Sequence, residues 1–395
     1  MMTNLSELLN KNVLEIEESG IRKIANLAIG MSDVVNLTFG QPDFPSPSYI
    51  NTAGIKAIQE NKTGYTLNSG LPELRKYASK YVQDLYGLTY NPDDEVLITT
   101  GASEALDLAF RTILSPGAEV ILPAPVYTGY EPLIKLCDAV PVFVDTRETG
   151  FKLTAEAIAE KITDKTRCII IPYPSNPTGT VLTKEEVLAI GEVLKDKNIF
   201  IVSDEIYSEL VYDVPHYSIA AVPGLRDKTI VINGLSKSHS MTGWRIGFTF
   251  APPYLTKLLL KLHAYNNVCA TSISQYAGIE ALKQGANHEE VLAMKNEYKK
   301  RREYVYNRLI EMGLEVEKPQ GAFYIFPSIK KFGLTSDEFA LKLLYEAKVG
   351  VIAGTAFSEY GEGYIRISYA QAMEELEEGL NRIGNFLSTL TMVNS

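Results

Sequence analysis

Short apolar runs rich in Val and Ile alternate with segments of helical periodicity through the middle of the chain. The runs predict strands over residues 95–100, 119–122, 140–144, 167–171, 199–202, 229–232 and 246–250. Helical patterns lie between several of them. One spans 103–114 with Ser103 as its expected cap, and another runs to Leu194 from a capping box at Thr183 and Glu186. Apolar strands separated by helices predict an α/β fold, with a mostly parallel sheet covered on both faces.

The pattern changes near residue 285. We expect helices over 289–312, 336–347 and 373–387, and strands over 314–317, 322–326, 349–352 and 364–368. This α+β order predicts a second, smaller domain. The first 45 residues do not fit the central pattern and are expected to return to that domain. The predicted division is therefore a large α/β domain over 46–284 and a small α+β domain formed by 1–45 and 285–395.

Composition and charge narrow the possible partners. The 395 residues include 48 acidic and 38 basic side chains, which gives a formal net charge of −10. This balance argues against nucleic acid or an anionic membrane as the main partner. The sequence shows neither a signal peptide nor an apolar stretch long enough to span a bilayer, so a cytoplasmic protein is expected. The three separated cysteines predict free thiols, and the histidine spacing gives no reason to expect a metal.

Small and polar residues follow several predicted strands, where ligands bind in open α/β sheets. Residues 101–103 open a helix whose free N–H groups could hold a phosphate. Asn176 stands in a turn rich in Pro and Gly, and Asp204 and Tyr207 follow the strand at 199–202. Each feature also has a structural explanation: an ordinary helix start, a rigid turn, and an Asp that caps the next helix.

The segment after the strand at 229–232 is harder to explain by structure alone. Lys237 lies among small and polar residues, and Arg245 follows between two apolar residues, where a guanidinium needs an anion. A surface lysine beside a structural arginine remains the alternative. A lysine that can bind a carbonyl covalently, together with a partner such as Asp204 for a pyridinium nitrogen, is typical of pyridoxal phosphate sites.

Four motifs occur in an order and spacing typical of one family: SNPTG at 175–179, DEIY at 204–207, SKSHSMTGWRIG at 236–247 and GEGYIRIS at 361–368. In these motifs the chain resembles the fold type I pyridoxal-phosphate-dependent aminotransferases of class I/II. The resemblance extends from Gly40 to Arg366. It implies pyridoxal 5'-phosphate as the cofactor, and a large domain with a mostly parallel sheet beside a smaller α+β domain.

The resemblance also implies roles for the residues nearest the reaction. Lys237 is similar to the lysine that holds the cofactor and, once displaced, moves a proton between the substrate Cα and the cofactor C4′. Asp204 would be the partner of the pyridine nitrogen. Tyr207 and Asn176 would form hydrogen bonds with the phenolic oxygen of the ring.

A phosphate site and a shared dimer follow from the same resemblance. The phosphate would be held by Arg245, Ser236 and the backbone N–H groups of Ala102 and Ser103. Tyr65 matches a tyrosine that reaches the phosphate of the neighbouring subunit, so a homodimer with shared active sites is expected. Tyr127 would stack on the cofactor, unless it is an exposed loop residue.

The substrate is expected at Arg366. This residue matches the arginine that binds the α-carboxylate through a bidentate fork, with Asn176 and the backbone of Gly40 completing the contact. From its strand context alone, Arg366 could equally be a surface residue in a salt bridge. The implied reaction moves an α-amino group between an amino acid, which we expect to be glutamate, and a 2-oxo acid by ping-pong kinetics.

The motifs leave the substrate side chain open. Within the family, the chain resembles the Bacillus-type enzymes for N-acetyl-LL-diaminopimelate in lysine biosynthesis, with an aromatic aminotransferase as the second interpretation. Candidate specificity residues lie around Ile21 and Arg22, beside Tyr65, and at 323–324 and 356–357; Arg22 could instead form a surface salt bridge. A pyridoxal phosphate C–S lyase with the same Lys, Asp and Arg is a further alternative. A non-catalytic regulator is disfavoured, because the chain shows no basic segment for DNA binding.

Overall fold

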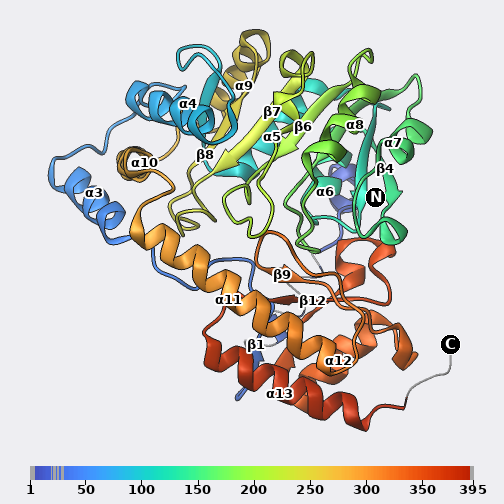
Figure 1. Ribbon diagram of the computed structural model, residues 1–395. Coiled ribbons are helices and arrows are strands. Elements are labelled where there is room, and N and C mark those ends of the chain that lie inside the picture. The colour runs from blue at the N-terminus through green and yellow to red at the C-terminus, as the bar shows by residue number, and fades with distance from the viewer. Residues whose placement is uncertain (1–4, 19, 21–23, 25, 28–30, 392–395) are drawn as a thin grey trace.

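A computed structural model describes residues 5–18, 20, 24, 26–27 and 31–391. A seven-stranded sheet with helices on both faces forms one part of the molecule (Figure 1). In the other part, three long helices pack around small sheets: α11 (Glu289–Glu311), α12 (Ser336–Ala347) and α13 (Met373–Thr389). The α/β fold class predicted from the sequence is thereby confirmed.

The central sheet has the strand order β2-β8-β7-β6-β5-β3-β4. Its strands are β2 (Val96–Thr99), β3 (Glu119–Ala124), β4 (Val140–Asp145), β5 (Thr166–Ile171), β6 (Phe200–Asp204), β7 (Thr229–Gly234) and β8 (Gly247–Phe250). All of them run parallel except β8, which is antiparallel to both of its neighbours. The mostly parallel sheet and all of its strands were predicted from the apolar runs.

Helices cover both faces of this sheet because alternate strand residues point to opposite sides. In β3, for example, Val120 and Leu122 join one apolar cluster and Ile121 joins another. The first face is covered by α5 (Ala102–Ile113), α6 (Tyr130–Lys135) and α9 (Pro253–Asn266). The opposite face is covered by α4 (Pro72–Tyr86), α7 (Ala155–Lys161), α8 (Lys184–Leu194) and α10 (Ser272–Gln284), with α3 (Ser48–Gln59) packed on α10.

The remaining helical segments among the described residues are short. They are the helix α1 (Lys11–Leu14) and the 3₁₀ turns η1 (Leu5–Leu8), η2 (Arg147–Thr149), η3 (Ile219–Ala221), η4 (Arg226–Lys228), η5 (Lys330–Phe332), η6 (Gly354–Phe357) and η7 (Glu359–Gly361).

The helices α8 and α5 differ in how their first turns are capped. The capping box of α8 is confirmed: the Glu186 N–H donates to the Thr183 hydroxyl, and the Thr183 N–H donates to the Glu186 carboxylate. The prediction that Ser103 caps α5 was wrong. The cap is Gly101, with φ 80° and no side chain, because the chain turns sharply there after β2. The first turn of α5 is therefore left without a side-chain cap.

The second part of the molecule joins the beginning of the chain to its end. Strand β1 (Val35–Asn36) pairs in parallel with β10 (Val349–Gly350). A separate antiparallel sheet has the order β11 (Ile352–Ala353), β12 (Ile365–Ser368) and β9 (Tyr324–Ile325). Leu37 belongs to the same apolar cluster as α11, α12 and α13. The division of the chain into two domains at the predicted boundaries stays a prediction.

Two strand predictions in this part need correction. No strand forms at 314–317: Leu314 packs in the apolar cluster and Val316 lies against it, but the backbone there forms no ladder. The Leu314 N–H donates back to the Leu309 carbonyl of α11, and the Glu315 carbonyl accepts from the Ser328 N–H. The strand expected at 349–352 is two short strands, β10 and β11, which pair with different partners.

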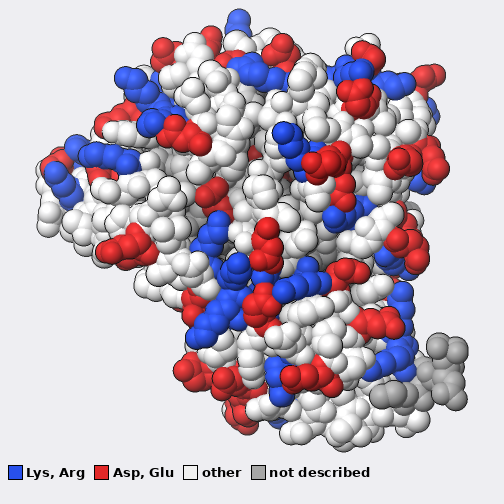
Figure 2. All heavy atoms as spheres, viewed as in Figure 1, with Lys and Arg blue, Asp and Glu red and all other residues white. Residues whose placement is uncertain are grey.

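The remaining features of the described chain are its surface charges and its three cysteines. No helix within the described residues is long and apolar enough to cross a membrane. On the face shown in Figure 2, basic and acidic side chains are interspersed. Cys168 is buried, and Cys137 and Cys269 are half-buried; all three are free thiols.

Candidate active site

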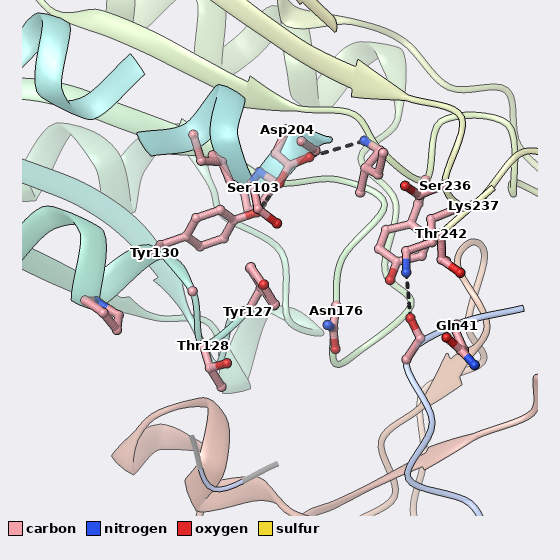
Figure 3. A pocket seen from close by; sticks show the side chains of 18 of the residues that line it. Gln41, Ser103, Tyr127, Thr128, Tyr130, Asn176, Asp204, Ser236, Lys237 and Thr242 are labelled. Atoms are coloured by element: carbon pink, nitrogen blue, oxygen red, sulfur yellow. Dashed lines mark hydrogen bonds between the residues drawn. The ribbon is translucent and has the colours of Figure 1, made fainter. Parts of the chain in front are cut away.

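A cavity of about 1240 Å³ lies at the carboxyl ends of the central strands. The sequence-predicted residues that line it are Gly40, Ala102, Ser103, Tyr127, Asn176, Asp204, Tyr207, Ser236, Lys237, Arg245 and Arg366. Figure 3 shows several of them projecting into the pocket from different segments of the chain. Tyr65 does not line the cavity of its own chain, and it is 85% exposed.

Lys237 follows β7 and projects into the cavity (Figure 3). Its ammonium donates a hydrogen bond to the carbonyl of Gly40 at 2.6 Å, and the rings of Tyr207 and Phe323 lie 5.9 and 5.8 Å away. The loss of water around the amine, together with the nearby cations Arg245 and Arg366, lowers the pKa of Lys237 to about 8. A substantial fraction of this lysine is therefore a neutral, nucleophilic amine at mildly alkaline pH.

Asp204 ends β6 and is buried beneath the cavity. One carboxylate oxygen accepts a hydrogen bond from the Tyr130 hydroxyl at 2.7 Å, and the other accepts one from the Ile206 N–H at 3.3 Å. Burial raises the pKa of Asp204 to about 6 despite these bonds. A carboxylate in this position would be stabilised by a cation placed against it, as a protonated pyridine nitrogen would be.

An anion site is built where α5 begins. A Cβ added at Gly101 would lie 2.5 Å from Nη2 of Arg245, so the absence of a side chain there lets the guanidinium lie against the start of the helix. The N–H groups of the first helical turn have no partner within the helix, and Ala102 and Ser103 supply two of them. Glu104 fixes this turn by accepting hydrogen bonds from the Thr100 N–H and from His263. Guanidinium, helix dipole and free N–H groups together suit a phosphate.

Arg366 lies on β12 and is only 1% exposed, which excludes the surface salt bridge that its strand context left open. Its guanidinium donates to the side-chain oxygen of Asn176 at 3.0 Å and to the carbonyl of Thr38 at 2.6 Å. Its Nε is buried without a partner among the described residues. Both acceptors are neutral, so the charge of this buried cation is left for a ligand to neutralise.

Aromatic rings surround Arg366 and the neighbouring part of the cavity. Tyr324 stands 4.4 Å from the Arg366 guanidinium, measured to the ring centre, and Phe357 stands 5.1 Å from it. The hydroxyls of Tyr207 and Tyr324 are 2.9 Å apart. Tyr127 is half-buried and meets the ring of Tyr130 edge to face, at 5.4 Å between centres.

These residues fit pyridoxal phosphate, the cofactor implied by the sequence resemblance. A phosphate cradle, an amine that can react with an aldehyde and a buried carboxylate line one cavity. The cavity contains two separate candidate anion sites. At one, the lack of a side chain at Gly101 leaves room for the guanidinium of Arg245. At the other, the buried Nε of Arg366 has no partner among the described residues. The set therefore accommodates a phosphorylated, aldehyde-bearing pyridine together with a carboxylate ligand.

Sequence reasoning missed Tyr130 and underused Tyr324. Tyr130 begins α6, whereas Tyr127 lies before that helix, so no helical periodicity in the sequence connected the two residues. Tyr324, which the sequence indicated only as a specificity residue, also contacts Tyr207. The predicted specificity residues Ile21 and Arg22 lie outside the described residues.

Comparison with known proteins gives consistent matches. The family model "Aminotransferase class I and II" matches residues 32–383. A probable N-acetyl-LL-diaminopimelate aminotransferase of Bacillus subtilis is 56% identical, over 97% of this chain and 96% of that protein. An aspartate aminotransferase of Pyrococcus abyssi is 41% identical, over 94% and 96% of the two chains. The crystal structure of an aromatic aminotransferase from Pyrococcus horikoshii superposes with a TM-score of 0.88 at 40% identity, covering 93% of this chain and 98% of that one.

Proposed function

Because the chain belongs to the class I and II aminotransferase family, we propose that its physiological reaction is the amination step of lysine biosynthesis that yields N-acetyl-LL-diaminopimelate, with glutamate as the amine donor. The chain is a pyridoxal-phosphate-dependent transaminase. Support for the substrate comes from the Bacillus subtilis relative at 56% identity. Relatives named for aspartate and for aromatic amino acids share 41% and 40% identity with this chain.

One observation carries the transaminase chemistry: Arg366, a buried cation bonded to neutral oxygens, lines the same cavity as Lys237. A guanidinium in this setting binds the α-carboxylate through two parallel hydrogen bonds. That contact fixes the α-carbon of every amino acid in the same place. Specificity for the side chain then depends on other parts of the cavity.

The other residues divide the work of binding and proton transfer. When bound, pyridoxal phosphate supplies an electron-accepting ring that weakens the Cα–H bond of the amino acid. Lys237 would remove the Cα proton and deliver it to the cofactor carbon C4′, two bonds away, which its lowered pKa permits. Asp204, held by Tyr130, keeps a proton on the pyridine nitrogen.

The remaining cofactor contacts follow the positions of the side chains around the cavity. Tyr207 and Asn176 would donate to the phenolic oxygen of the cofactor, and Tyr127 would cover one face of its ring. The phosphate would be bound by Arg245, Ser236 and the N–H groups of Ala102 and Ser103. Gly40 would contribute its backbone to the substrate carboxylate beside Arg366.

An aromatic amino acid aminotransferase is the second candidate. Phe39, Tyr127 and Tyr324 give the cavity an aromatic lining, which would suit a flat apolar side chain. Among the described residues that line the cavity, the cations are Lys237, Arg245 and Arg366, all of which already have proposed roles. A distal carboxylate on the substrate would therefore need a cation from elsewhere, such as Arg22 or the partner subunit.

We also propose a homodimer with shared active sites, in the cytoplasm. Tyr65 is highly exposed and lies outside its own cavity, as expected of a residue that reaches the phosphate of a neighbouring subunit. Sedimentation of the cofactor-loaded protein tests the dimer. A fully active monomer would contradict it.

The decisive experiment follows the visible absorbance of the cofactor-loaded protein as amino acids are added one at a time. Glutamate, N-acetyl-LL-diaminopimelate and phenylalanine are compared, and the relative rates at which they bleach the cofactor band rank the substrates. Recovery of the band on adding 2-oxoglutarate establishes transamination.

The controls separate the alternatives. Lys237→Ala should leave the band unbleached by any amino acid. Faster bleaching by phenylalanine than by N-acetyl-LL-diaminopimelate would favour the aromatic role. Pyruvate release from cystathionine, without bleaching by any of the three donors, would identify a C–S lyase and overturn the proposed reaction.

A further inference from the structure

The side chain of Tyr324 contacts both halves of the active site. It is 1% exposed and comes from β9, in the part of the molecule opposite the central sheet. Its hydroxyl oxygen lies 2.9 Å from that of Tyr207. Its ring centre lies 4.4 Å from the guanidinium of Arg366. A single side chain therefore contacts the proposed donor to the cofactor phenolic oxygen and the proposed substrate arginine.

The direction of the hydrogen bond between the two tyrosines follows from counting protons. Each phenol has one proton to donate and an oxygen that can accept. If Tyr207 donates its proton to the phenolic oxygen of the cofactor, its own oxygen can only accept from Tyr324. A donor that is itself hydrogen-bonded at its oxygen is polarised and becomes a stronger donor.

We propose that Tyr324 is a positioning residue with two separable functions: its hydroxyl strengthens Tyr207 as a donor, and its ring supports Arg366. This inference rests on the proposed roles of Tyr207 and Arg366. A purely structural role for Tyr324 would need only the ring, since Phe323 beside it fills the same apolar cluster without a hydroxyl.

The surroundings of Tyr324 favour this arrangement. A Cβ added at Gly40 would come within 3.3 Å of the Tyr324 hydroxyl oxygen, so this glycine allows the close approach. The carbonyl of Gly40 also accepts the hydrogen bond of the Lys237 ammonium. The hydroxyl thus lies beside the segment that holds the catalytic lysine, as well as against Tyr207.

The hydroxyl function is tested by titrating the visible absorbance of the cofactor-loaded protein with pH. A hydrogen bond to the phenolic oxygen stabilises its negative charge and lowers the pKa of the bound chromophore. Tyr207→Phe should therefore raise that pKa, and Tyr324→Phe should raise it less, by about 0.3 units. Tyr369→Phe is the matched control, because this buried tyrosine in the same apolar cluster donates to the Ala322 carbonyl instead.

The ring function is tested by binding of 3-phenylpropionate, a carboxylate without an amine, to the same proteins. Tyr324→Phe keeps the ring over Arg366 and should change the dissociation constant by less than about twofold. Tyr324→Leu removes the aromatic face and should weaken binding roughly tenfold. The Tyr369→Phe protein should bind as the wild type does.

The outcomes distinguish the proposed role of Tyr324 from the role of Tyr207 on which it rests. If Tyr207→Phe shifts the titration but Tyr324→Phe titrates like wild type, the hydroxyl function is wrong and the role of Tyr207 stands. If neither variant shifts it, the role of Tyr207 fails first. If Tyr324→Leu binds 3-phenylpropionate as tightly as Tyr324→Phe, the ring function is wrong. Should the leucine variant fail to fold, the titration of Tyr324→Phe still decides the hydroxyl function.

Discussion

The guanidinium of Arg366 has a geometry that a lysine cannot reproduce. It already donates to Asn176 and Thr38, and it retains a buried Nε without a partner among the described residues. Arg366→Lys keeps the charge but loses the planar fork, and each charge-assisted hydrogen bond contributes about 1.5–3 kcal/mol. We expect kcat/KM to fall roughly 10- to 100-fold for glutamate and phenylalanine alike.

Steady-state kinetics with both donors checks this prediction. Arg382→Lys is the control, because Arg382 lies on α13 and contacts Asp33 and Glu378 rather than the cavity. A loss confined to one donor would show that Arg366 reads the side chain and not the shared α-carboxylate.

The lowered pKa of Lys237 also predicts how stability depends on pH. Between about 8, its folded value, and 10.5, its usual value, the unfolded chain holds a proton on this lysine that the folded chain has lost. Stability therefore rises with pH across this window. In urea unfolding of the cofactor-free protein, wild type should gain stability relative to Lys237→Met as the pH is raised from 8 to 10.

A matched variant isolates this effect. Lys257 is exposed on α9, so Lys257→Met should not reproduce the pH trend of Lys237→Met. Parallel curves for wild type and Lys237→Met over the whole range would contradict the lowered pKa.

Individual site residues differed in how far the sequence revealed them. The sequence indicated Lys237 and Arg245 because burying a charged side chain among small or apolar residues costs free energy unless it has a partner. Arg366 did not, since a strand arginine is usually exposed, and only the family motif indicated its role. The sequence did not indicate Tyr130, because its partner Asp204 is 74 residues away in sequence. The two side chains meet only once β3 and β6 are placed in the sheet.

At the scale of secondary structure, the start of α5 requires a residue without a side chain at position 101. A side chain there would be strained by the φ of 80° and would displace the guanidinium of Arg245. Gly285 has nearly the same backbone, with φ 74° and ψ 178° against φ 80° and ψ 168° at Gly101, but a Cβ there would meet nothing within 4 Å. Both Gly→Ala changes should cost about 1–2 kcal/mol of backbone strain, while Gly101→Ala alone should weaken cofactor binding.

Equilibrium titration of the apo-proteins with pyridoxal phosphate separates the two effects. We expect at least a tenfold rise in the dissociation constant for Gly101→Ala and no change for Gly285→Ala. Equal weakening in both variants would mean that backbone strain, and not the cradle, governs affinity.

Helices and strands were predicted correctly where residues close together in sequence determine them. The capping box at Thr183 and the alternating faces of the central strands are local, and both were found. The strand expected at 314–317 was not, because burial of its apolar side chains does not require a β-ladder. The split at 349–352 depends on two partners far away in sequence, which no local pattern contains.

At the scale of the whole molecule, the proposed homodimer with shared active sites predicts complementation between inactive subunits. Mixing Tyr65→Ala with Lys237→Ala and allowing the subunits to exchange should give mixed dimers with one intact site each. Half of the dimers would be mixed, so about a quarter of wild-type activity should return. Mixing Asp204→Asn with Lys237→Ala should restore none, because both residues belong to one chain's cavity. Equal recovery in both mixtures would contradict sharing.

The pairing of β1 with β10 has a consequence for how the protein is made. The segment after β1 supplies the Thr38 carbonyl to Arg366 and the Gly40 carbonyl to Lys237, but β10 lies about 300 residues later. At roughly 5–20 residues per second, a ribosome needs about 15–60 s to reach it. During that interval the emerging chain carries an unpaired strand and an unfinished pocket, so the growing polypeptide cannot acquire activity until residues 349–366 have been translated.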